Sequence, residues 1–93
     1  MNDPNERRQR AIIVNTKGLH ARAAAKVAKL AVTFKSEITV TRGDQTVSAR
    51  SIMGLMMLAA AKGAEIEICA KGPDAESAVA AMVALVAGRF GES

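Results

Sequence analysis

Apolar and polar positions alternate along the chain with two different periods, and these periods predict four strands and three helices. Alternation at every second residue marks the strands, whereas apolar residues spaced at i, i+3, i+4 and i+7 mark the helices. The predicted elements, in order, are a strand at residues 11–15, a helix at 20–31, strands at 36–42 and 46–50, a helix at 52–62, a strand at 65–70 and a helix between Asp74 and Phe90. This β-α-β-β-α-β-α order favours a two-layer α+β sandwich.

Turn and capping residues separate the predicted elements. Gly43 and Asp44 supply turn chemistry between the second and third strands, which are therefore expected to form a hairpin. Ser51 is expected to be the N-cap of the second helix, and Gly63 is expected to end that helix at its C′ position. Asp74 is the candidate N-cap of the last helix.

The helices also predict what is buried and what is exposed. The first and last helices carry apolar stripes that we expect in the core, at Ala24, Val27, Ala28 and Ala31 and at Val79, Met82, Val83, Val86 and Phe90. Lys26 and Lys29 lie off the first stripe and are expected in solvent. The second helix is apolar on all sides and cannot bury every side chain, so Ile52 and Met53 are expected to form an exposed docking patch.

Length and composition fit one small domain. The chain has 93 residues, of which 49% are apolar, and we expect a flexible tail at residues 1–9 followed by a domain at 10–93. The net charge is +4, with an arginine cluster (Arg7, Arg8 and Arg10) that is expected to be solvated. Cys69, the single cysteine, has no partner for an internal disulfide and is expected to be a neutral filler. With no apolar run of bilayer length and no apolar signal-peptide region at the start, we expect a cytoplasmic protein.

The segment from Gly18 to Arg22 carries the candidate chemistry. His20, the only histidine, follows a glycine turn and lies at the start of a helix, where backbone N–H groups without intrahelical partners favour anions. The same positive helix end favours the neutral imidazole, which has a nucleophilic lone pair. Arg22, two residues later, can donate a pair of hydrogen bonds to phosphate oxygens. Together these groups predict a site for an anionic group attached to His20.

The sequence also allows three other interpretations. A single histidine at a helix start is most often a surface residue without chemistry. The basic charge and the predicted sheet allow an RNA-binding module, but such a sheet needs aromatic stacking residues, and the chain has no Tyr or Trp and no Phe in a predicted strand. One histidine and one cysteine are too few for a metal or thiol centre, so we expect no metal.

Two motifs resemble those of HPr, the histidine-containing phosphocarrier of the bacterial phosphotransferase system. The first is the Gly-Leu-His-x-Arg run ending at Arg22, and the second is Ser51 followed by an apolar helix, 31 residues after His20. The resemblance covers about residues 10–90 and implies an open-faced sandwich, with a four-stranded antiparallel sheet covered on one face by three helices. Two departures are Ala23 where many members have Pro, which loses some stiffening of the helix start, and Lys17 where many have Asn.

The resemblance implies roles for residues of both motifs. His20 would accept a phosphoryl group through Nδ1 from phosphorylated Enzyme I, Arg22 would stabilise the phosphate, and Ser51 would be a regulatory site of an ATP-dependent kinase. The protein would be a monomeric carrier without a cofactor, rather than a stand-alone enzyme, and would pass the group to enzyme IIA-type acceptors in sugar uptake or its regulation. A regulatory paralogue that is not coupled to transport stays open as an alternative. We expect neither nucleic acid binding nor membrane insertion, and we expect partner contacts at Leu19, Ala21, Lys29, Ile52 and Met53.

Overall fold

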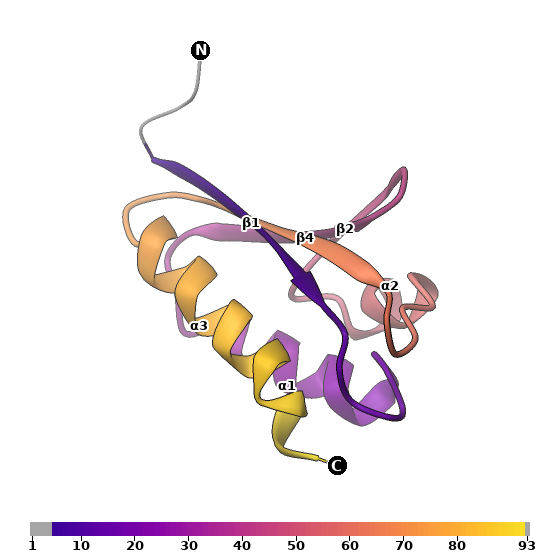
Figure 1. Ribbon diagram of the computed structural model, residues 1–93. Coiled ribbons are helices and arrows are strands. Elements are labelled where there is room, and N and C mark those ends of the chain that lie inside the picture. Colours follow the sequence, from indigo (N-terminus) through magenta and orange to yellow (C-terminus); the bar gives the residue numbers. More distant parts are fainter. Residues whose placement is uncertain (1–4, 93) are drawn as a thin grey trace.

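The chain forms a four-stranded sheet with helices on one face, as described by a computed structural model of residues 5–92 (Figure 1). Its elements are β1 (Glu6–Ile12), α1 (Ala21–Ala31), β2 (Glu37–Arg42), β3 (Gln45–Ser48), α2 (Ile52–Met57), β4 (Glu65–Lys71), α3 (Ala75–Ala87) and a short 3-10 helix, η1 (Arg89–Gly91). The sheet order is β1-β4-β2-β3, and each neighbouring pair is antiparallel. The helices lie on the same side of the sheet in Figure 1, which confirms the open-faced two-layer sandwich. Within residues 5–92, no helix has both the length and the apolar character needed to cross a bilayer.

The core lies between the helices and the inner face of the sheet. The predicted stripe of α1 is buried throughout, and the hairpin of β2 and β3 turns at Gly43 and Asp44 as predicted. At the centre of the core, side chains of the sheet meet those of the helices around a cavity of only about 10 Å³, lined by Leu19, Val27, Val40, Leu55, Ile66, Ile68, Met82, Val86 and Phe90. Such a volume is at the lower limit for one water molecule, so the core is closely packed.

The first strand begins earlier than the sequence predicts. It runs from Glu6 to Ile12 rather than over 11–15, and it takes in residues 6–9 of the predicted tail, so the three arginines lie in a strand rather than in a tail. Residues 1–4 lie outside the described residues. The strand pairs along its whole length with β4, from Glu6 opposite Lys71 to Ile12 opposite Glu65. The prediction was wrong because this strand shows almost no apolar alternation.

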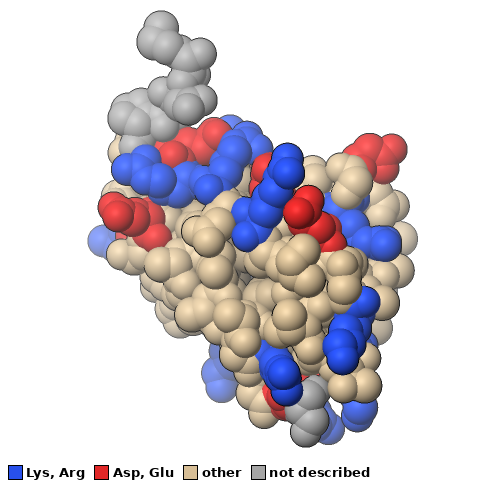
Figure 2. Space-filling view, in the orientation of Figure 1, with Lys and Arg blue, Asp and Glu red and all other residues tan. Residues whose placement is uncertain are grey.

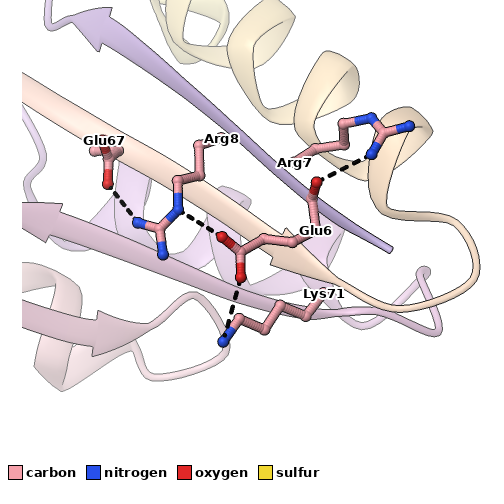
Figure 3. A network of polar contacts seen from close by, with 5 residues as sticks. All are labelled: Glu6, Arg7, Arg8, Glu67 and Lys71. Atoms are coloured by element: carbon pink, nitrogen blue, oxygen red, sulfur yellow. Dashed lines mark hydrogen bonds and ion pairs between the residues drawn. The ribbon is translucent and has the colours of Figure 1, made fainter. Parts of the chain in front are cut away.

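Ion pairs on the outer face of the sheet stabilise β1 although its sequence is polar (Figure 3). Arg8 donates to Glu6 (2.7 Å) and to Glu67 on β4 (2.9 Å), and Lys71 lies 3.4 Å from Glu6. Figure 2 shows the resulting band of basic side chains, interleaved with acidic ones, over the upper part of the molecule. Cys69 lies opposite Arg8 in the register, and burial raises the pKa of its thiol, in agreement with a neutral filler.

The second helix is shorter than predicted. It ends at Met57 with Leu58 as C-cap, and Ala59 adopts a left-handed backbone (φ +52°), so the chain turns away before Lys62. The segment that follows forms hydrogen bonds with the chain around the first turn: Leu19 N–H donates to Ala60 O (2.8 Å), and Ile13 N–H donates to Ala64 O (2.9 Å). These tertiary bonds replace further helical ones, and Gly63 lies in the turn before β4 instead of at a helix end.

Asp74 precedes α3, as predicted, but its carboxylate does not cap that helix. It accepts hydrogen bonds from the backbone N–H groups of Lys35 (2.9 Å) and Ser36 (2.8 Å) and from the Ser36 hydroxyl. These donors hold the pKa of Asp74 below its usual value, the Ser36 hydroxyl contributing most. Asp74 therefore links the start of α3 to the residues just before β2 by hydrogen bonds.

This arrangement predicts an acid-sensitive contribution to stability. A carboxylate whose pKa is lowered by folding stabilises the fold above its unfolded pKa, and the contribution is lost as pH falls through the folded pKa. We expect Asp74→Asn to be less stable than the wild type at neutral pH and to lose less stability on acidification. Thermal melts between neutral pH and about pH 2 measure this difference. Asp44→Asn, in the exposed hairpin turn, is the control; equal acid profiles for Asp74→Asn and the wild type would contradict the assignment.

Candidate functional site

A tight turn between β1 and α1 places His20 at the start of the helix. Gly18 has a left-handed backbone (φ +67°), and a Cβ at this position would lie 2.5 Å from the carbonyl oxygen of Ala60, so only glycine fits. Asn15, which is fully buried, closes the turn by donating from its Nδ2 to Gly18 O (2.8 Å). His20 follows as the N-cap residue with extended backbone (φ −84°, ψ −178°), and α1 begins at the next residue. The predicted position of His20 at a helix mouth is confirmed.

The imidazole of His20 is held by a carboxylate from the other end of the chain. Its Nε2 lies 2.8 and 2.9 Å from the two carboxylate oxygens of Glu92, and the two side chains are 27% and 18% exposed. Asn15 Nδ2 also donates to Glu92 Oε1 (2.8 Å). The hydrogen bond from His20, followed by that from Asn15, holds the pKa of Glu92 below its usual value.

This contact determines which ring nitrogen can act as a nucleophile. An ionised carboxylate only accepts hydrogen bonds, so the proton of the ring that faces Glu92 is assigned to Nε2. In the neutral imidazole the other nitrogen, Nδ1, then carries the lone pair. The arrangement is suited to attack by Nδ1 on an electrophilic centre such as phosphorus.

The helix start supplies positive groups near the ring. The first turn of α1 has no acidic residue, and the His20 side chain does not cap it. Its first N–H groups have no acceptor within the helix and favour an anion. Arg22 lies in this turn and is exposed, and no hydrogen bond or ion pair joins its side chain to another residue of the described chain. Its guanidinium is therefore available to a phosphate.

Ser51 has the structural role that the sequence predicts. Its hydroxyl oxygen accepts a hydrogen bond from Gly54 N–H (2.9 Å), which makes it the N-cap of α2. The next two residues are exposed, Ile52 by 43% and Met53 by 71%, as expected for a patch that the fold leaves uncovered. Helix α2 packs against α1, the helix that His20 starts.

Among the residues expected to contact partners, Leu19 differs from the prediction. Its side chain is 5% exposed and belongs to the core, because this apolar side chain packs with Val27 and Leu55 instead of facing solvent. Ala21 and Lys29 are exposed on α1. Lys26, expected to be solvated only, donates to the carbonyl oxygen of Phe90 and so joins α1 to η1.

Sequence reasoning did not find Asn15 and Glu92. Glu92 is 72 residues from His20 along the sequence, and no local sequence pattern predicts a contact between residues so far apart. The signal for Asn15 was weak but present, since an amide following the apolar residues Ile12, Ile13 and Val14 is placed at a buried position whose hydrogen bonds must be satisfied. Glu92 belongs to the site through its contact with the ring, and Asn15 belongs to it through its hydrogen bond to Glu92.

Comparison with known proteins places the site in a family. A family profile described as the PTS HPr component phosphorylation site matches residues 7–88. Phosphocarrier protein HPr of Cupriavidus necator is 49% identical over 86% of this chain and 90% of its own, and that of Neisseria meningitidis is 52% identical over the same shares. The crystal structure of HPr-C-His from Thermoanaerobacter tengcongensis superposes with a TM-score of 0.89 at 39% identity, covering 94% of this chain and 98% of the other. The chain therefore belongs to the HPr family of phosphocarrier proteins of the phosphotransferase system.

Proposed function

We propose that this protein is a cytoplasmic phosphocarrier that accepts a phosphoryl group on Nδ1 of His20 from phosphorylated Enzyme I and passes it to enzyme IIA-type acceptors. The observation that carries the proposal is the contact of His20 Nε2 with the carboxylate of Glu92, which leaves the lone pair on Nδ1. The Nδ1–phosphorus bond forms as the bond between phosphorus and the donor breaks. The electron pair of the broken bond leaves with the donor. Membership of the family supports partners of this kind.

A second candidate is a regulatory phosphotransferase role without sugar uptake. Phosphocarrier protein NPr of Shewanella violacea is 47% identical over 87% of this chain, nearly as similar as the HPr relatives. The site chemistry is the same in both candidates, because they differ in the acceptor downstream. Presenting the phosphorylated protein to the IIA-type proteins of its own organism and measuring which one accepts the group distinguishes the two.

The central experiment is phosphorylation by the expected donor. The protein is incubated with Enzyme I, phosphoenolpyruvate and Mg²⁺, and the stability of the label is followed in acid and base. We expect one phosphoryl group per chain, labile in acid and stable in base, as for a phosphohistidine. Absence of label with an Enzyme I that is active on another HPr would overturn the proposal.

Arg22 is proposed to stabilise the transferring phosphoryl group more than the resting site. A guanidinium gains little beside a neutral imidazole but donates strong hydrogen bonds to phosphate oxygens. We expect Arg22→Ala to fold normally and to accept the phosphoryl group at least about tenfold more slowly, or about 1.4 kcal/mol in the barrier. Initial rates with catalytic Enzyme I measure the effect. Arg10→Ala, on β1, serves as the control, and normal rates in folded Arg22→Ala would contradict the role.

Exposed residues of α1 and α2 are proposed to contact the partners. Ala21 and Lys29 on α1 and Ile52 and Met53 on α2 lie on two helices that pack together, and the last two form an apolar surface. Apolar side chains that remain exposed on a small domain are suited to docking, and methionine adapts to several partners.

Ser51 is proposed to be a regulatory phosphorylation site whose charge weakens transfer. Aspartate caps a helix as well as serine does, so Ser51→Asp should melt like the wild type. Its charge should repel the incoming phosphoryl group and lower the rate of transfer by about three- to tenfold at low salt, and less at high salt. Rates at two salt concentrations, with melts alongside, test this. Ser77→Asp on α3 is the control. Equal transfer rates in Ser51→Asp and the wild type at low salt, or a much lower melting temperature of Ser51→Asp, would refute the electrostatic effect.

A further inference from the structure

Two side chains from the connection between β1 and α1 and one from the far end of the described chain form a continuous line of hydrogen bonds that ends at the imidazole. Asn15 comes from the turn after β1, Glu92 from the residue after η1, and His20 from the start of α1. Asn15 Nδ2 donates to Glu92 Oε1 (2.8 Å), and both oxygens of Glu92 lie within 2.9 Å of His20 Nε2. We name this line the Asn15–Glu92–His20 chain.

The orientation of the Asn15 amide is fixed by its surroundings. Its Nδ2 donates to two acceptors, Gly18 O and Glu92 Oε1, so turning the amide over would place Oδ1 against two oxygens. The side chain is fully buried, and Oδ1 has no hydrogen-bond partner in the structure of residues 5–92. A buried acceptor without a partner is destabilising, and such groups are rare in native structures, so each one needs a physical reason. The two donated bonds, rather than packing, therefore account for an asparagine at this position.

The segment that carries Glu92 is itself anchored. Phe90, two residues earlier, is 1% exposed in the core, and its carbonyl oxygen accepts a hydrogen bond from Lys26 of α1. Lys17, in the turn before His20, is a further positive group that acts on Glu92. The segment is thus anchored in the core and to α1, and the carboxylate that it carries is bonded by Asn15.

We propose that Asn15 and Glu92 are positioning residues for phosphoryl transfer, Asn15 by fixing the Glu92 carboxylate and Glu92 by fixing the tautomer of His20 and stabilising its imidazolium. The proposal rests on the proposed function. When Nδ1 forms its bond to phosphorus, the donor departs with the electron pair of the broken bond, and the ring becomes an imidazolium whose proton stays on Nε2. That proton faces the Glu92 carboxylate, so the positive charge forms beside a negative one already in place. The same proton keeps the ring a good leaving group when the phosphoryl group moves on to an acceptor.

The first test reads the ring directly and needs no donor. Protein with ¹⁵N-labelled histidine and asparagine side chains is examined by NMR in the wild type, Glu92→Ala, Asn15→Ala and a matched control, Glu76→Ala on α3. In the wild type and control we expect an Nε2–H resonance of His20 that exchanges slowly with water; both site variants should lose it. The Asn15 Nδ2 resonances should also move in Glu92→Ala, which tests the link even where Asn15→Ala fails to fold. Unchanged His20 or Asn15 signals in Glu92→Ala would overturn the proposal.

The second test measures transfer. With the protein as the varied substrate of Enzyme I, Glu92→Ala should lower kcat about tenfold and leave KM within about twofold, because charge-assisted hydrogen bonds act on the ring and not on docking. Glu92→Gln keeps an oxygen acceptor without the charge and should fall between Glu92→Ala and the wild type. An unchanged kcat in Glu92→Ala would overturn the role in transfer. Wild-type protein that accepts no phosphoryl group would instead refute the proposed function, and the NMR result is read independently of it.

Discussion

Replacing His20 with alanine is expected to abolish phosphorylation by Enzyme I and phosphoenolpyruvate. His20 is the only histidine of the chain, and its Nδ1, which the contact with Glu92 leaves available, is the nucleophile that we propose. Loss of the attacking atom removes the covalent route altogether, so we expect a reduction to background, beyond about a thousandfold. Incorporation of phosphate per chain, measured at full conversion of the wild type, gives the result.

His20→Ala is expected to fold, so that a loss of phosphorylation can be attributed to the missing imidazole. The His20 side chain is about one quarter exposed and does not cap α1, and the backbone bond from Ala24 N–H to His20 O does not depend on the side chain. Circular dichroism and a thermal melt should therefore resemble those of the wild type. Acid-labile label that persists in folded His20→Ala would show that another residue is the acceptor, whereas acid-stable label would indicate a hydroxyl such as that of Ser51.

Truncation of Phe90 is expected to have the largest effect on stability. The ring is 1% exposed and lies against the aliphatic core of α1, α3 and the sheet, where almost no empty volume remains. Deleting a buried phenyl ring costs about 3–5 kcal/mol, because the cavity that is left closes only in part. Since small domains are stable by roughly 5–15 kcal/mol, Phe90→Ala should lose a large share of the free energy of unfolding. Urea denaturation gives this value, and Val32→Ala, at an exposed position, should change it by less than about 0.5 kcal/mol.

The same substitution should also disturb the site from a distance. Phe90 has a left-handed backbone (φ +53°) that turns the chain after α3, and the residue that holds His20 follows two positions later. In folded Phe90→Ala, the slowly exchanging Nε2–H signal of His20 should weaken or disappear. Wild-type stability in Phe90→Ala would contradict the assignment of this ring to the core, and an undisturbed imidazole signal would show that η1 does not set the position of Glu92.

Local sequence patterns predicted the parts of the fold that depend on near neighbours. The turn at Gly43 and Asp44, the capping bond of Ser51 and the position of His20 at a helix start all involve residues within a few positions of one another. Each is stabilised by turn or capping chemistry that a short window of sequence contains. The exposure of Met53 followed from a helix with more apolar faces than it could bury.

The errors occurred where distant residues decide the structure. Strand β1 starts at Glu6 because Arg8 forms ion pairs with a carboxylate on its own strand and with one on β4, 59 residues away. Alternation of apolar and polar residues does not reveal such pairs. Helix α2 stops early because Ala60 accepts the N–H of Leu19. The Glu92 contact with His20 spans 72 residues and escaped prediction for the same reason.

The order of the strands also has a consequence for how the sheet opens and closes. β4 has neighbours on both sides, whereas β1 contacts β4 alone among the strands and forms one edge of the sheet. Pairing β1 requires closing a loop of most of the chain, and such closure is slower than that of the local β2–β3 hairpin. The amides at the centre of β4 should therefore be the most protected from hydrogen exchange, and β1 should detach and re-dock in partial openings that leave β2, β3 and β4 together.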